Sequence, residues 1–365
     1  MRTVPDGSSR ETQSFWIPEC SNRVFKTQEE ALAAPLRKFE LQRSNRYGFF
    51  ANVQATPIDF SIDYLVDQTF SATFSAHLNL VADAVEQISS PESSICEIGS
   101  GSGSFLSILA ARSFKALRGF DESHTGDDIR IEKSYPSDRD APLGAQLLIL
   151  RHTLDYIINP ASYLANLRRI NGHDCDLMIE VPCFDWILSQ GHFWDLTFER
   201  INYFTEDSLE TLFGNDLVKI SRVFDDQYLL VHARLRDRVE LSDHFQTETC
   251  QEQLRDFGYA QSENLVKQLG DSAYWIWGAG SKGVMFLHHH LRWRPLHKPL
   301  GCVDINPMRQ GTFMPSTGLE IMSPTKFREL FRTTQPVVVL NHNYVDEVAR
   351  SIEELTGATA RIIAP

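Results

Sequence analysis

A short glycine-rich stretch, SICEIGSGSGSFL at residues 94–106, contains the residues whose types and spacing most clearly suggest chemistry. An apolar run leads into it, and three glycines then recur at every second position: Gly99, Gly101 and Gly103. Glycine lets the backbone approach a ligand closely, and a helix that starts after the turn offers N–H groups that have no partner within the helix. A dinucleotide site directs such groups at a pyrophosphate, but the carboxylate of Glu97 at the mouth of this turn would repel phosphate.

A ligand that is cationic and lacks phosphate suits Glu97 better. S-adenosylmethionine (SAM), with a sulfonium and an α-ammonium group, has those properties, so the sequence predicts SAM as the ligand of this turn. The next apolar run ends in Asp121, eighteen residues beyond Gly103. An acid in that place can accept hydrogen bonds from both hydroxyls of a ribose.

The segment 145–167 adds a third expected strand, followed by a loop and an amphipathic helix. In a doubly wound sheet, the carboxyl end of this strand opens on the same crevice as the glycine turn. Arg151 and His152 are therefore expected to border the adenine or methionine moiety, although His152 could instead only cap the loop.

With these motifs, the chain resembles the class I SAM-dependent methyltransferases. More narrowly, it resembles the C-methyltransferases of nucleotide-linked deoxyketosugars and their relatives of unassigned substrate, over nearly the whole chain. The resemblance implies an α/β fold with a Rossmann-like class I methyltransferase domain, a second, C-terminal Rossmann-like domain and a small N-terminal segment. It also implies transfer of the sulfonium methyl to carbon, oxygen or nitrogen of a small molecule such as a sugar, a sugar nucleotide or a natural-product intermediate.

The segment 179–213 carries the family's E-V-P motif and most of a longer pattern, F-W-D-x-x-Y-E-H-x-x-Y-F. The matching residues are Glu180, Val181, Pro182, Phe193, Trp194, Asp195, Glu199, Tyr203 and Phe204. The family's catalytic tyrosine and histidine are not kept, because Phe198 and Arg200 stand in their places. In that family the histidine is implicated in removing an α-proton, so that an enolate can attack the SAM methyl.

Arg200 cannot act as that base, because a guanidinium keeps its proton at neutral pH. It could hold a carboxylate or phosphate of the substrate, or stabilise an enolate or alkoxide oxygen. Alternatively, it forms a structural ion pair with Glu199 or Asp195. Through the resemblance, Tyr64 is expected beside the substrate and the methionine end of SAM, with lid packing as the alternative. The remaining candidates for a base are Glu199, His192, His152 and Tyr64.

The N-terminal stretch 18–52 corresponds to a region in which the family binds structural zinc through two CxxC pairs. The four ligand places fall at Cys20, Arg23, Ser44 and Tyr47, so only one thiol is kept. A closed structural zinc site needs about four ligands. We therefore predict that no zinc binds, and that this segment is held by apolar packing and is free to act as a lid.

A second strand, glycine turn and helix are expected over 274–287, with Gly278, Gly280 and Gly283 in G-x-G-x-x-G spacing. This motif alone is a weak indicator of NAD. The resemblance implies instead a Rossmann-like companion domain that has no redox cofactor of its own. Lys282 could meet a substrate phosphate or carboxylate, which would make the acceptor anionic; alternatively, the domain is purely structural.

Four histidines cluster in LHHHLRWRPLH, residues 287–297. Consecutive residues on a helix point about 100° apart and cannot easily share one metal ion. We therefore predict a solvated helix end at this cluster.

The composition is that of a globular protein of several domains, with 365 residues, 42% of them hydrophobic, and a net charge of −13. No run of basic residues suggests a nucleic-acid partner. No stretch approaches the roughly 18 consecutive apolar residues of a membrane span, and the start is polar, so a cytoplasmic location is expected. The expected division is a degenerate zinc-ribbon-like or lid segment (1–60), a SAM-binding domain (61–235), a helical connector (236–272) and a C-terminal Rossmann-like domain (273–365).

The preferred hypothesis is a SAM-dependent methyltransferase in which Arg200 gives electrostatic help and Glu199 or a nearby histidine handles protons. One alternative is a non-catalytic or regulatory protein that binds SAM or its product, S-adenosylhomocysteine (SAH). Another is a SAM-using enzyme with diverged chemistry. The intact set of Glu97, three glycines and Asp121 favours the enzyme.

Overall fold

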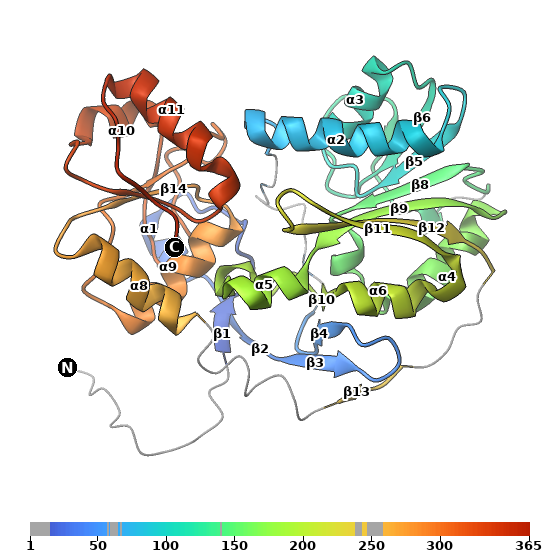
Figure 1. Cartoon of the computed structure of the whole chain (residues 1–365), viewed down its shortest axis with the longest axis horizontal. Helices are drawn as coiled ribbons and strands as arrows, with labels where there is room; N and C mark the ends of the chain where they lie inside the picture. The colour runs from blue at the N-terminus through green and yellow to red at the C-terminus, as the bar shows by residue number, and fades with distance from the viewer. Residues whose placement is uncertain are drawn as a thin grey trace.

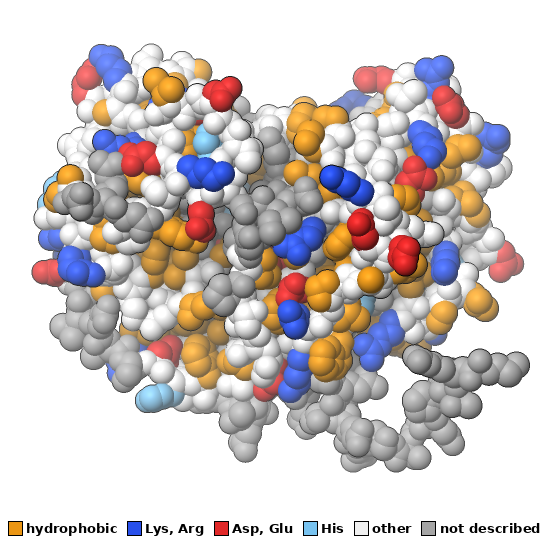
Figure 2. Space-filling view, turned by 180° about the vertical axis from the view of Figure 1, so that it is seen from behind, with side chains coloured by type: hydrophobic (Ala, Val, Ile, Leu, Met, Phe, Trp, Pro, Cys, Tyr) orange, Lys and Arg blue, Asp and Glu red, His pale blue; other side chains and the backbone are white. Residues whose placement is uncertain are grey.

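The computed structural model describes residues 15–56, 58, 65, 68–138, 141–237, 243–246 and 258–365. Two units lie side by side, each built on a largely parallel sheet flanked by helices, and the N-terminal strands run beneath them (Figure 1). Seen from behind, Lys and Arg side chains lie among Asp and Glu side chains and form no continuous basic surface on that face (Figure 2). None of the helices in the described part of the chain is long and apolar enough to cross a bilayer.

The first unit contains a seven-stranded sheet in the order β11-β12-β9-β8-β5-β6-β7. Its strands are β5 (Ser94–Ile98), β6 (Ala116–Phe120), β7 (Ile131–Glu132), β8 (Leu147–Arg151), β9 (Cys175–Pro182), β11 (Leu217–Val223) and β12 (Tyr228–Leu235). The five neighbouring strands β9, β8, β5, β6 and β7 run parallel to one another. By contrast, β12 pairs antiparallel with both β9 and β11. Chain order reverses between β5 and β8, and in a doubly wound sheet a ligand binds at such a switch point, beyond the carboxyl ends of the strands.

Helices cover both faces of this sheet (Figure 1). On one face lie α2 (Ala72–Ile88) and α3 (Ser104–Ala111), and on the other α4 (Pro160–Asn171), α5 (Phe184–Gln190) and α6 (Glu206–Phe213). The α2 helix begins at Ser71, whose side chain accepts a hydrogen bond from the backbone of Phe74 at 3.1 Å. Its apolar residues recur at helical spacing and are buried against the sheet, which explains why this segment is a helix. Short 3-10 turns connect the elements: η1 (Pro136–Asp138), η2 (Leu154–Tyr156), η3 (Phe193–Asp195) and η4 (Gly214–Asp216).

The C-terminal unit is a five-stranded parallel sheet in the order β16-β15-β14-β17-β18. Its strands are β14 (Trp275–Trp277), β15 (Cys302–Val303), β16 (Ile321–Met322), β17 (Val337–Val339) and β18 (Ile362–Ile363). Its helical elements are α8 (Tyr259–Leu269), α9 (Ser281–Trp293), α10 (Pro324–Leu330), η5 (His342–Tyr344) and α11 (Val345–Thr356). Both units thus have the Rossmann-like α/β architecture that the sequence predicts.

The N-terminal elements contact both units. They comprise β1 (Phe15–Pro18), α1 (Gln28–Leu32), β2 (Leu36–Phe39), β3 (Leu41–Ser44) and β4 (Phe50–Asn52). A bridge pairs Phe25 with Phe313 of the C-terminal unit, while β4 pairs with β10 (Asn202–Tyr203) of the first unit. On the other side, β3 pairs with β13 (Phe245–Gln246). This strand lies in the stretch for which the sequence pattern predicts helix, and the prediction is wrong there because pairing with β3 decides the local structure.

Candidate functional site

The three glycines of the first turn all adopt left-handed backbone conformations, with φ of 77° at Gly99, 56° at Gly101 and 83° at Gly103. A Cβ atom on Gly99 would lie 2.2 Å from Oγ1 of Thr153, so the turn packs directly on the loop after β8. A Cβ atom on Gly101 would meet nothing within 4 Å among the described residues. The first glycine is therefore needed for close packing, and the second leaves an open face beside the start of α3.

Asp121 follows β6 directly and is hydrogen-bonded to the glycine turn. Its Oδ2 accepts from the backbone N of Gly101 at 2.7 Å, and its Oδ1 accepts from the backbone N of Ser123 at 2.9 Å. Because a carboxylate has about four acceptor sites, Asp121 keeps capacity for further donors. The acid thus lies where the sequence places it, and it also holds the turn in shape.

Glu97 is buried at the end of β5, with 2% of its surface exposed. Its Oε1 lies 3.9 Å from Nη1 of Arg151, and its Oε2 is buried without a hydrogen-bond partner in the described part of the chain. Burial raises the pKa of Glu97 to about 8; Arg151 opposes that rise, and the nearby carboxylates of Asp121 and Glu180 add to it. A cationic ligand beside this buried acid would stabilise its ionised form.

Arg151 is shared between two carboxylates, because Glu180 lies opposite it in the register of β8 and β9. Glu180 is fully buried and accepts a hydrogen bond from Nε of Arg151 at 2.8 Å and another from Nε2 of His77 on α2. Burial disfavours the charged form of Glu180, but Arg151, His152 and His77 together hold its pKa well below the usual range. The sequence gives Glu180 only as part of a motif, and it gives no signal for His77.

His152 has an unusual backbone conformation for a residue other than glycine, with φ of 48°. Its Nε2 lies 3.7 Å from Oε2 of Glu180 and makes no hydrogen bond with described residues, and its ring contacts Tyr228 edge-on at 4.7 Å. Burial lowers the pKa of His152 to about 4, although Glu180 opposes that shift. The imidazole is therefore neutral at pH 7. Backbone strain of this kind concentrates at functional sites.

Arg200 is paired with Asp155 in the turn after β8. Its Nε lies 3.1 Å from Oδ2 of Asp155, and its Nη1 donates to the backbone oxygen of Asp195 at 2.8 Å. The expectation of an ion pair with the carboxylate of Glu199 or Asp195 is therefore wrong, because the fold brings the β8 loop under the guanidinium. Burial raises the pKa of Asp155 to about 6, and Arg200 opposes that rise. Only tertiary contact identifies Asp155.

An ion pair between Lys282 and Asp195 joins the two units. Nζ of Lys282, at the start of α9, lies 2.5 Å from both carboxylate oxygens of Asp195 in η3. His192 lies beside them, with its Nδ1 3.7 Å from Oδ2 of Asp195 and its ring 4.3 Å from that of Trp186. Burial lowers the pKa of His192 and of Lys282. Lys282 thus lies between the units, where a protein carboxylate holds its ammonium group.

Glu199 is tied to the N-terminal segment. One of its carboxylate oxygens accepts hydrogen bonds from the backbone N of Ser21, at 2.9 Å, and from the Ser21 hydroxyl. Burial raises the pKa of Glu199, while Ser21 and Arg200 oppose that rise. Another base candidate, Tyr64, lies outside the described residues.

The second glycine turn is arranged like the first, but a side chain of the same chain caps it. The backbone N of Ala279 donates to Oδ2 of Asp304 at 2.7 Å, as the backbone N of Gly101 does to Asp121. At the start of α9, however, the backbone N of Ser281 donates to Oδ1 of Asn22 at 3.1 Å. Gly103, the N-cap residue of α3, has no side chain that could cap its own helix. The second turn is therefore capped by a side chain from a distant segment, whereas the helix of the first turn begins at a glycine.

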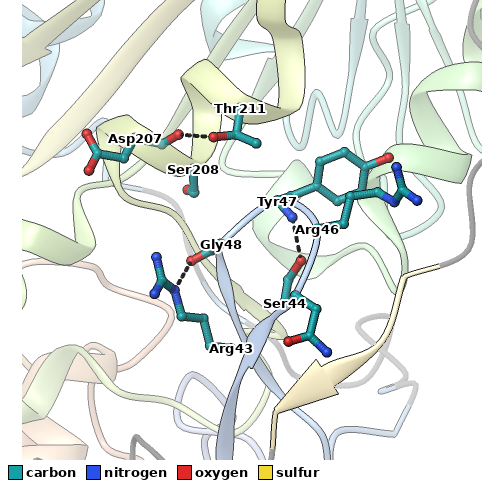
Figure 3. Close-up of a pocket in the computed structure, with 9 residues that line it drawn as sticks. Arg43, Ser44, Arg46, Tyr47, Gly48, Asp207, Ser208 and Thr211 are labelled. Carbon is teal, nitrogen blue, oxygen red and sulfur yellow. Dashed lines mark hydrogen bonds between the residues drawn. The ribbon is translucent and has the colours of Figure 1, made fainter.

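The four places that correspond to zinc ligands in the resembling family carry the side chains of Cys20, Arg23, Ser44 and Tyr47, which are not a zinc ligand set. Cys20 is a buried free thiol, and the hydroxyl of Ser44 donates to Asp243 at 2.6 Å. The β3–β4 turn that contains Ser44 and Tyr47 faces the first turn of α6 across a polar pocket of about 220 Å³ (Figure 3). Within the described residues, no group of three or more His, Cys, Asp or Glu side chains is placed to hold a metal ion.

The histidine cluster on α9 is not a solvated helix end, so that prediction is wrong. His289 and His290 are buried, and His290 hydrogen-bonds to Ser262 on α8 at 2.6 Å and to His297 at 2.9 Å. His288 contacts the backbone oxygen of Trp16 at 2.8 Å. Packing of α8 and β1 against α9 buries this face, which helical spacing alone does not reveal.

Residues 74–215 match the sequence model of a family described as a methyltransferase domain. The match covers less than half of the chain, and it spans the first glycine turn, Asp121, Arg151 and Arg200. Together with the strand order, it identifies a class I methyltransferase domain within the first unit. No curated protein matches the chain significantly.

The solved structures that resemble this chain include methyltransferases that overlap with less than half of it. They include the 1,6-didemethyltoxoflavin-N1-methyltransferase of Burkholderia thailandensis (16% identity, 46% of this chain and 80% of that chain, TM-score 0.35). Others are the magnesium protoporphyrin IX methyltransferase of Synechocystis (14%, 47% and 88%, TM-score 0.36) and a SAM-dependent methyltransferase of Aquifex aeolicus (14%, 42% and 89%, TM-score 0.32). The narrower resemblance to sugar C-methyltransferases stays a prediction.

Proposed function

We propose that the chain binds SAM at the first glycine turn and catalyses transfer of its methyl group to a small-molecule acceptor. The observation that carries this proposal is Glu97, a buried acid at the mouth of the first glycine turn, one of whose oxygens has no hydrogen-bond partner among the described residues. A phosphate there would keep Glu97 in its protonated form, because a nearby anion raises the pKa of a buried carboxyl further. An ammonium group would stabilise the ionised form and provide the donor that Oε2 lacks.

Each residue of the turn has a distinct role in this proposal. Glu97 holds the α-ammonium group, and Asp121 accepts from the ribose hydroxyls with the acceptor capacity that its contacts with the turn leave unused. Gly99, Gly101 and Gly103 let the backbone approach the ligand. Arg151 and His152, at the carboxyl end of β8, border the adenine or methionine moiety.

When bound, SAM supplies an electrophilic methyl group on a sulfonium. The chain's own residues then have to hold the acceptor in line with that methyl group and keep water away, which accounts for much of the rate of a methyl transfer. The candidate acceptor wall consists of Arg200, the Lys282–Asp195 pair and His152. The N-terminal segment, with the connector and the C-terminal Rossmann-like domain, closes the substrate side in this proposal.

Two residues of the wall suit two kinds of nucleophile. His152 is neutral, and its Nε2 has no hydrogen-bond partner among the described residues, so it can accept a hydrogen bond from a nucleophile that still carries a proton; its pKa of about 4 makes it a weak base. Arg200 suits a nucleophile that is already ionised, because it is a fixed cation. Glu199 is a weaker candidate for a base than the sequence suggests, since Ser21 occupies one of its oxygens. The acceptor remains a sugar, a sugar nucleotide or a natural-product intermediate in this proposal.

Calorimetry tests the proposed function directly. Titration of the full chain with SAM and with SAH should each give a saturable heat with one site, and titration with NAD should give none. A Gln substitution of Glu92, an exposed acid paired with Lys115, serves as a control and should bind SAM like the wild type. Saturable NAD binding with no heat from SAM or SAH would overturn the proposal.

A further inference from the structure

We propose that the acceptor carries a carboxylate, that Arg200 and Lys282 hold this group, and that one of its oxygens receives the methyl group. This inference rests on the proposed function and specifies the acceptor class and the atom that is methylated.

The first support is the way in which the cations of the wall are oriented relative to their acids. The side chain of Arg200 is 13% exposed and that of its partner Asp155 is 1% exposed. The same order holds for Lys282 and Asp195, at 22% and 10%. Because the acids lie behind the cations, the accessible part of each pair is positive, although the whole chain carries a net charge of −13. Such a wall attracts an anion.

The second support is that Arg200 and Lys282 are fixed on one residue. Nη1 of Arg200 donates to the backbone oxygen of Asp195, and Nζ of Lys282 contacts the carboxylate of the same residue. The two cations therefore approach the crevice from neighbouring directions, one from each unit of the fold. A group held by both would lie between the units.

The third support is the hydrogen bonding of the guanidinium. Arg200 uses Nε for Asp155 and Nη1 for Asp195, and within the described residues nothing accepts a hydrogen bond from Nη2. The buried carboxylate of Asp155 fixes the orientation of the planar guanidinium group. A planar cation that is held in this way and has a free N–H is well suited to a carboxylate oxygen.

Methylation of a carboxylate explains how an arginine can occupy the position at which the resembling family has a histidine base. A carboxylate is ionised at neutral pH, so its methylation requires no base. A lone pair on one carboxylate oxygen forms the new bond to the methyl carbon. The bond between that carbon and sulfur breaks, and its electron pair goes to sulfur, so that a sulfonium and a carboxylate become a neutral thioether and a methyl ester. Arg200 can hold the second oxygen throughout.

A labelling experiment separates this acceptor class from the others. The wild-type chain is incubated with SAM labelled with tritium in the methyl group and with a small-molecule cell extract divided on an anion exchanger. Label should be transferred to the retained, acidic fraction, and mild alkali should release it as volatile methanol, as methyl esters do. Label that is transferred only to the unretained fraction, or that stays fixed in alkali, would overturn the inference. Transfer to neither fraction by a protein that binds SAM would also count against it.

Variants of Arg200 test its role by comparing the KM for the acceptor with the Kd for SAM. A purely structural role would not change the KM alone. Loss of a hydrogen bond to a charged group corresponds to roughly a ten- to hundredfold effect, so R200Q should raise the KM for the acidic fraction by that order and leave the Kd for SAM unchanged. R234Q is the matched control, because Arg234 pairs with Asp176 at the opposite end of β9. Its KM should equal that of the wild type.

The double variant D155N/R200Q keeps this test valid if R200Q does not fold, because it removes both charges of the buried pair. It should fold, bind SAM and show the same rise in KM. An unchanged KM in a folded R200Q or double variant would refute the role of Arg200. Failure of the wild type to bind SAM at all would instead refute the proposed function, so the two failures are distinguishable.

Discussion

Replacement of Glu97 by Gln should weaken SAM binding and at the same time remove a pH-dependent loss of stability. In the ligand-free protein, burial raises the pKa of Glu97 to about 8. An unfolded chain has no such burial, so its glutamate titrates near pH 4.3. Between these two values the unfolded chain has released the proton and the folded chain retains it.

The sign of the stability effect follows from that difference in bound protons. The free energy of unfolding falls with rising pH wherever the folded state binds more protons, at up to about 1.4 kcal/mol per pH unit for one group. Glu97 therefore contributes most to stability below about pH 4.3. That contribution is lost as the pH rises toward the folded-state pKa of about 8. E97Q should lack this slope, and urea unfolding at several pH values measures it.

Binding of SAM should have the opposite dependence on pH. If the ammonium group of SAM requires an ionised Glu97, the fraction of competent protein rises on the order of 20-fold between about pH 6 and pH 7.5. The Kd of the wild type should fall by that factor, and calorimetry at each pH measures it. E97Q should bind about ten- to hundredfold more weakly at pH 7.5, since a charged hydrogen bond is lost, and its Kd should not change with pH.

Two results would refute this reasoning. One is an E97Q variant that binds SAM as tightly as the wild type. The other is a wild-type Kd that stays flat over this pH range. E92Q, at an exposed ion pair, should match the wild type in both measurements.

Three further variants test the packing around the site. G99A should unfold at a lower temperature than G101A, because both add a side chain at positive φ but only the first places it 2.2 Å from another atom; a lower melting temperature for G101A would contradict the geometry of the turn. K282M should lower the free energy of unfolding by about 3–5 kcal/mol by leaving Asp195 buried and unpaired, and D195N/K282M should recover part of that loss in urea unfolding. If the double variant recovers nothing, the pair is not coupled. N22A should destabilise the protein by at least about 1 kcal/mol, because it removes the acceptor of both the Ser281 amide at the start of α9 and the Arg309 guanidinium, with the Kd for SAM unchanged in calorimetry; a weaker Kd would show that Asn22 also serves the first turn.

The sequence predicts the first glycine turn well because its contacts are local or follow from a regular pattern. Glu97, the three glycines and Asp121 lie within one strand, turn, helix and strand, and the amide of Gly101 meets Asp121 only 20 residues away. A parallel sheet with helices on both faces brings the carboxyl ends of its strands together whatever the loops do. Apolar patterning and glycine spacing are therefore enough to indicate the fold class and the end of the sheet at which the turn lies.

The acceptor wall could not be derived in the same way. The sequence pattern draws attention to Arg200, but its actual partner, Asp155, is 45 positions away in a loop with no motif. Lys282 meets Asp195 across 87 positions, and His77 meets Glu180 across 103. Such pairs depend on how the two units pack together and on the order of the strands in the sheet. Neither feature can be read from the residues that are close in the sequence.

The amino-acid sequence by itself thus determined the α/β architecture, the strand–turn–helix unit and the acidic residue at its mouth, because short-range periodicity and backbone sterics are properties of neighbouring residues. Only the tertiary structure decided which acid stands behind each cation, that Asn22 fills the second glycine turn, and that the α9 histidines are buried. Those features depend on burial and on hydrogen bonds between distant segments, which arise when the chain packs into one body.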